Sequence, residues 1–350
     1  MHDQFDMVRL FRDALELCRV GVGETAIVLT EGDIRADYAD AFLLAARDLG
    51  ASVFEINVPR RPLGESRNFT GRNALSGNRP AIEALKAADI VIDLMGLLFS
   101  SEQAEITAAG ARMLMVREPL DILRKMFPDR DLRRRVEHGA MLLAASRHLR
   151  VTSDAGTSLD FEMGAYPVLT QYGYTDTPGR WDHFATGQVL SQGNDGSVNG
   201  RLVVMPGDLV TDFRRYVERP VTLTIRDGMV VSIEGDGADA ALLAGYMRSF
   251  DDPRAYAVSH IGWGLCQNAA WFHNAVTRTR DAEVGVNSLS FYGNVLFSLG
   301  PNTELGGSND TPCHIDIPLR RSNLYLDGEP IVLDGDIVVP EMRVPGHVVA

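Results

Sequence analysis

The sequence predicts an α/β protein with an open, doubly wound N-terminal domain over residues 1–150 and a β-rich α+β domain over residues 151–350. Strand-like and helix-like periodicities alternate in the first part, which is typical of βαβ units. Asp-Gly turn signals separate short apolar runs in the second part, which is typical of antiparallel hairpins. A length of 350 residues is also sufficient for two domains.

In the N-terminal part, apolar residues recur at helical spacing in several segments, and short β-branched runs lie between them. The predicted helices cover residues 4–19, 36–49, 80–88, 101–109 and 130–147. The predicted strands cover residues 25–29, 52–58, 90–94 and 112–116. Gly50 and Gly110 stand where a glycine commonly ends a helix. The alternation predicts a mostly parallel sheet that is covered by helices on both faces.

In the second part, three pairs of strand-like segments flank a turn signal and predict hairpins. The three signals are Asp154-Ala-Gly156, Asp227-Gly228 and Asp327-Gly328. Helices are expected only over residues 238–250 and 267–278. The polar segment of residues 193–200 has no apolar period, so we expect a mobile loop there.

The net charge of the chain disfavours some classes of binding partner. Lys and Arg total 34 against 47 Asp and Glu, which leaves a net charge of −13. Such a field repels nucleic acid and anionic membrane surfaces. The longest apolar run, residues 90–99, is too short to span a bilayer, and the acidic start does not resemble a signal peptide. Three cysteines without CxxC spacing argue against a disulfide framework. We therefore expect a soluble, cytoplasmic protein.

A His-x-Asp pair is the first candidate for a metal site. In a strand, residues two apart project to the same face, so His314 and Asp316 are predicted to lie side by side. An imidazole and a carboxylate in that arrangement can bind one divalent ion. The alternative is that Asp316 orients a histidine of the core.

A second histidine strengthens the metal interpretation. His260 lies inside an apolar strand-like run, where an imidazole without a partner costs about 1–3 kcal/mol. Gly262 and Gly264 beside it allow a ligand or another backbone to approach. Two histidines and one aspartate are the ligands of the facial triad of non-haem Fe(II) oxygenases, which leaves coordination positions open. The C-terminal domain is therefore predicted to be the metal-binding one.

Two further residues keep two interpretations each. His183 lies in an expected loop and has the aromatic residues Trp181 and Phe184 as near neighbours in the sequence. It is either a surface histidine or a catalytic acid/base. Glu304, in a turn after a predicted strand, is either a further metal ligand or a turn carboxylate.

Several long motifs together resemble the 2,5-dihydroxypyridine 5,6-dioxygenase family over nearly the whole chain. These motifs are Ser259-His-Ile-Gly-Trp-Gly-Leu265, Phe291-Tyr-Gly-Asn294, Gly300-Pro-Asn-Thr-Glu304, Pro312-Cys-His-Ile-Asp-Ile-Pro-Leu-Arg320, Gly179-Arg-Trp-Asp-His183 and Ser100-Ser-Glu-Gln103. The architecture is more distantly similar to the thermophilic-type metal aminopeptidases, whose C-terminal domain also carries a His-x-Asp pair.

The resemblance implies a single Fe(II) held by His260, His314 and Asp316, and cleavage of the pyridine ring between C5 and C6 to give N-formylmaleamate. It further implies a homo-oligomer whose partners are O₂ and a small aromatic N-heterocyclic substrate. The family's substrate pocket maps onto Leu98, Ser298 and His183.

Two positions depart from the family pattern and leave the ring substrate open. Phe99, within the expected substrate pocket, stands where the family has an acid/base histidine, and Gln171 stands where a glutamate is usual. A dioxygenase of the family that acts on a different hydroxylated ring is therefore one alternative. A two-metal aminopeptidase, with Glu304 and Glu162 grouped near the triad, is another. A third is a binder of aromatic ligands without turnover.

Overall fold

The computed structural model describes residues 2–60, 73–98, 100–213, 215–272 and 286–346. Its described residues form two compact units. Unit 1 contains the described residues within 2–128 and 172–185, and unit 2 contains the described residues within 129–171, 186–272 and 286–346. This division differs from the boundary predicted near residue 150, because the chain enters unit 2 after Pro128 and, within the described residues, returns to unit 1 at Tyr172–Ala185.

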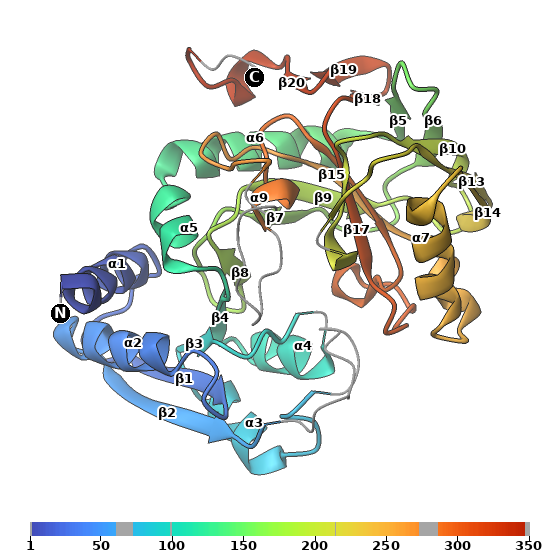
Figure 1. Ribbon diagram of the computed structural model, residues 1–350. Helices are drawn as coiled ribbons and strands as arrows, with labels where there is room; N and C mark the ends of the chain where they lie inside the picture. Colours follow the sequence, from blue (N-terminus) through green and yellow to red (C-terminus); the bar gives the residue numbers. More distant parts are fainter. Residues whose placement is uncertain (1, 61–72, 99, 214, 273–285, 347–350) are drawn as a thin grey trace. The chain divides into compact units, whose positions relative to one another are not determined.

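Unit 1 is built on a sheet of five strands in the order β2-β1-β3-β4-β8, which we call sheet A (Figure 1). All four neighbouring pairs are parallel. The strands are β1 (Thr25–Glu31), β2 (Ser52–Val58), β3 (Ile90–Asp93), β4 (Arg112–Val116) and β8 (Trp181–Phe184). The order reverses at β1, so right-handed crossovers place helices on both faces. The predicted doubly wound α/β fold is confirmed.

The helices of unit 1 agree with the predicted segments, and the sequence missed only the short helix α5. They are α1 (His2–Leu17), α2 (Ala36–Asp48), α3 (Arg79–Lys86), α4 (Ser101–Ala108) and α5 (Leu120–Lys125). Helix α1 packs on α2, where Phe11 stacks on Phe42 with ring centroids 3.9 Å apart. Gly50 and Gly110 follow α2 and α4 with φ values of 84° and 104°, as expected for residues that end a helix.

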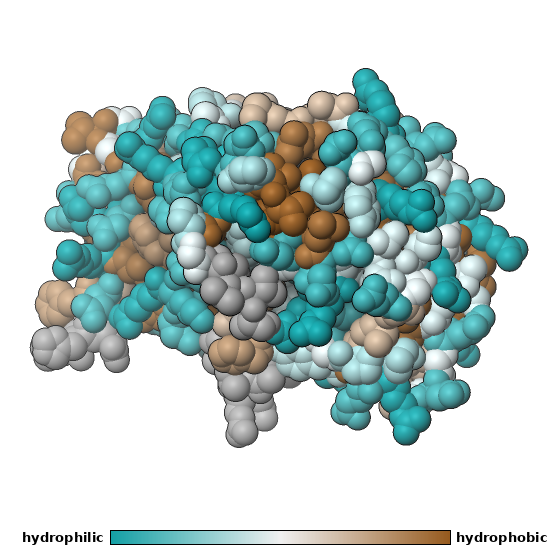
Figure 2. All heavy atoms as spheres, turned by 90° about the horizontal axis from the view of Figure 1, so that it is seen from above, coloured by the Kyte–Doolittle hydropathy of each residue, from teal (hydrophilic) through white to brown (hydrophobic). Residues whose placement is uncertain are grey.

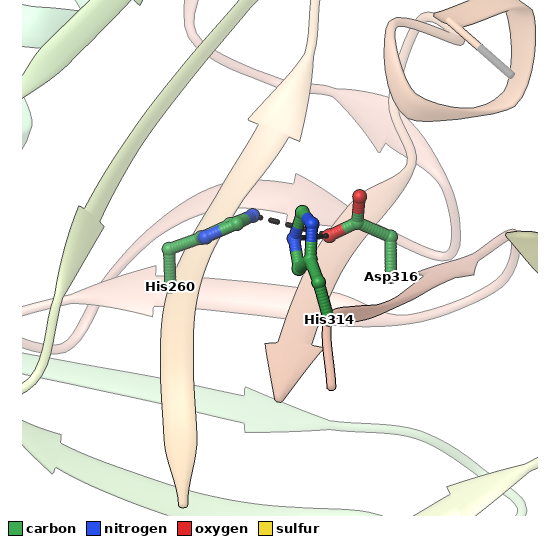
Figure 3. Close-up of side chains that lie close together, drawn as sticks. All are labelled: His260, His314 and Asp316. Atoms are coloured by element: carbon green, nitrogen blue, oxygen red, sulfur yellow. Dashed lines mark ion pairs between the residues drawn. The ribbon is translucent and has the colours of Figure 1, made fainter. Parts of the chain in front are cut away.

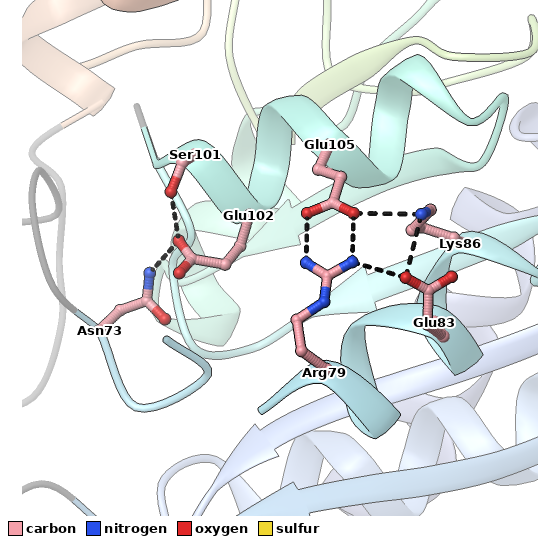
Figure 4. A network of polar contacts seen from close by, with 7 residues as sticks. All are labelled: Asn73, Arg79, Glu83, Lys86, Ser101, Glu102 and Glu105. Atoms are coloured by element: carbon pink, nitrogen blue, oxygen red, sulfur yellow. Dashed lines mark hydrogen bonds and ion pairs between the residues drawn. The ribbon is translucent and has the colours of Figure 1, made fainter. Parts of the chain in front are cut away.

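An ion-pair network joins α3 to α4 (Figure 4). The guanidinium of Arg79 donates to both carboxylate oxygens of Glu105 at 2.8 Å, and Glu83 and Lys86 complete the network. The network lies over one face of sheet A, where Ile82, Leu85 and Ile106 are buried with apolar residues of β1, β3 and β4.

Unit 2 contains an eight-stranded sheet, sheet B, in the order β14-β13-β10-β6-β5-β18-β19-β20. Its strands are β5 (His148–Thr152), β6 (Ser158–Glu162), β10 (Asn199–Val204), β13 (Val221–Arg226), β14 (Met229–Glu234), β18 (Asn323–Leu326), β19 (Glu329–Leu333) and β20 (Asp336–Ile337). The three predicted hairpins are confirmed as the antiparallel pairs β5–β6, β13–β14 and β18–β19. Asp227 and Asp327 have positive φ in their turns, which the primed turns of hairpins require.

The second large sheet of unit 2, sheet C, has the order β17-β16-β15-β9-β7 and is antiparallel throughout. Its strands are β7 (Leu169–Gln171), β9 (Gln188–Gln192), β15 (Val258–Gly264), β16 (Val295–Leu299) and β17 (Ile315–Leu319). Helix α6 (Arg130–Ala145) packs on one face of sheet C: a Cβ at Gly139 would lie 3.1 Å from the ring of Trp263. Trp263 and His260 alternate along β15, so the opposite face carries His260.

Smaller elements complete unit 2. They are the β11–β12 pair (Leu209–Val210, Arg215–Tyr216), α7 (Ala238–Arg248), α9 (Val286–Leu289) and the short 3₁₀ turns η1 (Thr211–Phe213), η2 (Pro253–Tyr256), η3 (Thr303–Leu305) and η4 (Pro340–Met342). The predicted helix over residues 238–250 is confirmed as α7. The helix predicted over residues 267–278 is wrong for residues 267–272, which form turns and irregular structure, and the rest lies outside the described residues.

None of the described helices is long and apolar enough to cross a membrane. On the face of the molecule seen in Figure 2, hydrophobic side chains form a patch surrounded by hydrophilic ones.

Candidate metal centre

The candidate metal centre lies on the face of sheet C that points away from α6. His260 of β15 is paired with Gln192 of β9, and Ser298 of β16 is paired with Asp316 of β17. Directly opposite residues of antiparallel strands project to the same face of a sheet. The two members of each pair therefore lie side by side on neighbouring strands. His314 precedes β17 by one residue and lies two positions from Asp316. The predicted His-x-Asp geometry is therefore reached at the start of a strand.

His260, His314 and Asp316 converge on one point (Figure 3). One potential ligand atom from each residue lies within 4.8 Å of the other two, and all three residues are buried. The Nε2 atoms of His260 and His314 lie 3.2 Å and 3.4 Å from Oδ1 of Asp316. In the described part of the chain, these three side chains form a group of His, Cys, Asp or Glu residues with the spacing of a metal site.

The charges of this group are strongly coupled. Burial lowers the pKa of His260, but Asp316 and Glu304 outweigh burial and raise this pKa to about 9. Burial also opposes protonation of His314, and Asp316 still raises its pKa. Burial raises the pKa of Asp316, yet the two imidazoles hold it well below its ordinary value. A divalent cation requires neutral imidazoles, so it would replace these protons when it binds.

The residues present fit a divalent transition metal. Oδ1 of Asp316 is buried and accepts no hydrogen bond of normal geometry from the described residues. Two imidazole nitrogens and one carboxylate oxygen are the donor set of mononuclear Fe(II) sites with open coordination positions. A closed structural zinc site would need a fourth ligand, and Mg²⁺ prefers more oxygen donors.

The far side of the His260 ring faces two other side chains. Nδ1 lies 3.2 Å from the hydroxyl oxygen of Ser259 and 3.6 Å from Oε1 of Glu304. The Ser259 hydroxyl donates a hydrogen bond to the carbonyl oxygen of Pro301. Glu304 is therefore close to a metal ligand but is not itself a member of the three-residue group.

Gly262 and Gly264, near His260 on β15, allow the backbone of neighbouring segments to pack closely against this strand. A Cβ at Gly262 would collide with the carbonyl oxygen of Val189, and one at Gly264 would collide with the backbone of residues 290–291. Of the two approaches that the sequence allowed, a ligand or another backbone, the structure shows the backbone of neighbouring segments.

His183 is a residue of β8 and not of a loop, which corrects the predicted location. It is 2% exposed, so the alternative of a surface histidine is wrong as well. Burial, together with the positive charge of Arg117, lowers the pKa of His183 to about 3. Its Nε2 atom has no hydrogen-bond partner among the described residues. A neutral, buried imidazole is therefore available at the carboxyl end of sheet A.

Asp182 fixes the segment that carries His183. Its carboxylate accepts hydrogen bonds from the backbone N–H groups of Tyr172, Gly173 and His183, and from the guanidinium of Arg180 at 2.6 Å. The Arg180 guanidinium also stacks over the Tyr172 ring, 3.8 Å from its centroid. The contacts of Asp182, Arg180 and Tyr172 thus hold β8, the edge strand of sheet A, in place.

The predicted substrate-binding residues are located in both units. Leu98 is buried in the apolar cluster of unit 1. Ser298, in unit 2, is fully buried, and its hydroxyl donates to the carbonyl oxygen of Ile315 at 3.2 Å. Phe99 lies outside the described residues.

Three glutamines, Gln171, Gln188 and Gln192, lie on the same face of sheet C as His260. Oε1 of Gln171 accepts a hydrogen bond from Nε2 of Gln188, with the two atoms 2.5 Å apart. Gln192 was missed by sequence reasoning, since only the strand register shows that it is paired with His260. Its Oε1 atom is buried without a hydrogen-bond partner among the described residues.

The two-metal grouping expected for an aminopeptidase is not formed by the described residues. Glu162 is exposed on β6 of sheet B, and Glu304 faces the side of His260 that points away from Asp316.

Comparison with known proteins places these features in a family. The family model described as 2,5-dihydroxypyridine 5,6-dioxygenase matches residues 6–339. A curated 2,5-dihydroxypyridine 5,6-dioxygenase from Pseudomonas putida is 41% identical over 340 residues, which cover 96% of this chain and 97% of that protein.

Solved structures agree with this likeness. The structure of the Pseudomonas putida 2,5-dihydroxypyridine dioxygenase superimposes with a TM-score of 0.94 at 40% identity, over 97% of this chain and 99% of that one. Wild-type AmpT from Thermus thermophilus has a TM-score of 0.63 at 12% identity, over 95% of this chain and 99% of that one. The second likeness concerns the fold alone.

Proposed function

Because this chain belongs to the 2,5-dihydroxypyridine 5,6-dioxygenase family, we propose that it is an Fe(II)-dependent ring-cleaving dioxygenase. The proposed substrate is 2,5-dihydroxypyridine, which is opened between C5 and C6 to N-formylmaleamate with incorporation of both atoms of O₂. The observation that carries the proposal is the convergence of His260, His314 and Asp316 within 4.8 Å on a buried face of sheet C.

His260, His314 and Asp316 would hold the iron. When bound in such a site, Fe(II) brings an electron-rich ring and O₂ together at open coordination positions. The two imidazoles contribute neutral nitrogen donors and Asp316 contributes one negative charge. Burial of all three residues keeps water from competing with the substrate and strengthens each electrostatic contact.

We propose that Leu98, Phe99 and Ser298 bind the substrate and that His183 is the catalytic acid/base. For Leu98, Phe99 and His183, which belong to the part of the chain around unit 1, the proposal rests on the resemblance of the sequence motifs. A pKa of about 3 makes His183 a neutral imidazole at pH 7. In that form it can accept a proton in a short-lived step or hold a substrate hydroxyl through a hydrogen bond.

The test is oxygen consumption with a panel of hydroxypyridines in the presence of Fe(II). We expect stoichiometric uptake of O₂ with 2,5-dihydroxypyridine, and loss of both iron and turnover in His314→Ala. Full activity of that variant would remove the triad from the proposal. Hydrolysis of aminoacyl anilides with Zn²⁺ or Co²⁺, without uptake of O₂, would assign the chain to peptide hydrolysis instead.

The identity of the ring is tested at Phe99. If the phenylalanine lowers efficiency with 2,5-dihydroxypyridine, Phe99→His should raise kcat/KM, because a proton-transfer group contributes about 10²–10⁴ in rate. An unchanged or lower value, together with turnover of another hydroxylated ring by the parent chain, would identify that ring as the substrate.

We also propose that the chain forms a homo-oligomer. The hydrophobic patch on the face in Figure 2 supports this proposal, since such patches commonly mark protein–protein contacts. The molar mass in solution, measured by light scattering against the chain mass of 38.3 kDa, tests it; a mass equal to one chain would contradict it.

A further inference from the structure

We propose that Glu304 is a positioning residue for the metal centre: together with Ser259 it keeps the proton of His260 on Nδ1, so that Nε2 is the atom offered to the metal. The inference rests on the proposed function for the presence of a metal at His260, His314 and Asp316. It resolves the two interpretations that the sequence left for Glu304, because the residue acts here neither as a ligand nor as a solvated turn carboxylate.

The position of Glu304 is fixed by a well-bonded loop between β16 and β17. Glu304 lies in η3, and Asn302 at its start accepts hydrogen bonds from the backbone N–H groups of Leu305 and Gly307 through its carbonyl oxygen. The side chain of Asn302 accepts from the N–H of Asn309 at 2.8 Å, and Asn309 donates to the carbonyl oxygen of Gly300 at 2.7 Å. These bonds close the loop and hold η3 in place.

Two glycines let the loop take this path. Gly300 has a φ of 105°, and a Cβ there would collide with the carbonyl oxygen of Cys313. A Cβ at Gly307 would collide with the side chain of Asn302. Both positions therefore require glycine, because neighbouring atoms leave no room for a side chain. The loop path that results places the carboxylate of Glu304 beside His260.

The hydrogen-bond inventory around His260 assigns its proton. A serine hydroxyl has a single hydrogen. Ser259 donates that hydrogen to the carbonyl oxygen of Pro301, so its oxygen can only accept from Nδ1 of His260, 3.2 Å away. Glu304 Oε1, 3.6 Å from Nδ1, is an acceptor as well. Both groups near Nδ1 are acceptors, so Nδ1 carries a proton, and Nε2, which faces Asp316 at 3.2 Å, is the nitrogen left for a metal (Figure 3).

The burial of Glu304 supports a partner of this kind. Its side chain is 8% exposed, and neither carboxylate oxygen has a hydrogen-bond partner of normal geometry among the described residues. A buried carboxylate is costly unless a positive group compensates it. The Nδ1–H group of His260 lies 3.6 Å from Oε1 and turns the positive end of its dipole toward this carboxylate, and a metal bound at Nε2 would increase that polarity. Carboxylate–histidine–metal arrangements of this type increase metal affinity, and their loss typically costs 10–100-fold.

The test measures metal affinity without turnover. Chelator-treated parent protein, Glu304→Gln and Glu304→Ala are titrated with Co²⁺ by calorimetry, with Glu329→Gln, an exposed carboxylate of β19, as the matched control. We expect one Co²⁺ per chain and a Kd that rises about 10–100-fold in both Glu304 variants, with no change in the control. Glu304→Gln keeps the size of the side chain, so the test does not depend on the folding of Glu304→Ala.

A second readout distinguishes positioning from a general structural role. In the diamagnetic Zn²⁺-loaded protein, long-range ¹H–¹⁵N spectra should show His260 with hydrogen on Nδ1 and the metal on Nε2. Metal on Nδ1, a stoichiometry of two ions per chain, or unchanged affinity in Glu304→Gln would each overturn the inference. A parent protein that binds no divalent ion at all would overturn the proposed function and this inference with it.

Discussion

Gln192 of β9 lies directly opposite His260 of β15, and the two side chains project from the same face of sheet C. The Oε1 atom of Gln192 is buried without a hydrogen-bond partner among the described residues. A buried acceptor without a donor costs about 1–3 kcal/mol, so a donor from a bound molecule would stabilise the complex by a similar amount. A hydroxyl or ring N–H of the substrate has the required chemistry.

Replacement of this carboxamide should therefore weaken substrate binding and leave the metal in place. In Gln192→Met we expect KM for the hydroxypyridine to rise about fivefold, because one buried hydrogen bond contributes about 1 kcal/mol. Steady-state kinetics with iron content measured in parallel check this. An unchanged KM with full iron content would show that Gln192 does not contact the substrate.

Metal binding should raise thermal stability through His314. At a free Co²⁺ concentration of about 100 times Kd, an ion that binds only the folded chain adds about 2.7 kcal/mol. The thermal midpoint of the parent protein should rise accordingly, and that of His314→Ala should not. His148→Ala, an exposed histidine of β5, is the matched control and should respond like the parent. An equal rise in all three proteins would place the ion elsewhere.

His183 should make the protein sensitive to acid. Its pKa of about 3 in the folded chain lies below the value of 6.5 expected when unfolded. The unfolded state therefore binds more protons between these values, and stability falls as the pH falls from about 6.5 toward 3. At pH 5 this single group destabilises the protein by about 2 kcal/mol relative to pH 7.

Urea unfolding at pH 7 and pH 5 measures this contribution. The free energy of unfolding should decrease less between the two pH values in His183→Gln than in the parent. The comparison uses the difference between pH values, so any loss of packing in the variant cancels. Equal decreases in both proteins would contradict a neutral, buried His183.

Two Gly→Ala substitutions should have opposite effects. In Gly262→Ala the new Cβ would collide with the carbonyl oxygen of Val189, so β9 and β15 must separate and the centre loses its shape. We expect destabilisation by more than about 3 kcal/mol and loss of metal binding. Gly245→Ala, at an uncrowded position inside α7, should stabilise by about 0.5–1 kcal/mol. Denaturant midpoints compare the two, and a stable, metal-binding Gly262→Ala would refute the steric argument.

Local patterns predicted much of this molecule. Two Asp-Gly turns and the Asp154-Ala-Gly156 turn predicted three hairpins, because turn type depends on a few adjacent residues. The two-residue period of a strand predicted that His314 and Asp316 would project together. The resemblance of the motifs led to the family that the comparisons then showed.

Features that depend on distant pairing could not be predicted from the sequence. The neighbour of His260 depends on the register between β9 and β15, which no local pattern specifies. His183 was assigned to a loop because its aromatic and charged neighbours lack strand alternation, yet pairing of β8 with β4 makes it part of sheet A. The contact between Glu304 and His260 likewise depends on how one loop closes.

Strand β8 lies far along the sequence from the other strands of sheet A, and this affects how the chain can be truncated and how it folds during synthesis. Sheet A is completed by Trp181–Phe184, whereas its other four strands lie before residue 117. A ribosome must therefore deliver the whole intervening segment before the edge of β4 is covered, and until then that edge is open to pairing with other chains. A truncation after Pro128 would leave the same edge bare and should aggregate, so the N-terminal region is not a free-standing fragment.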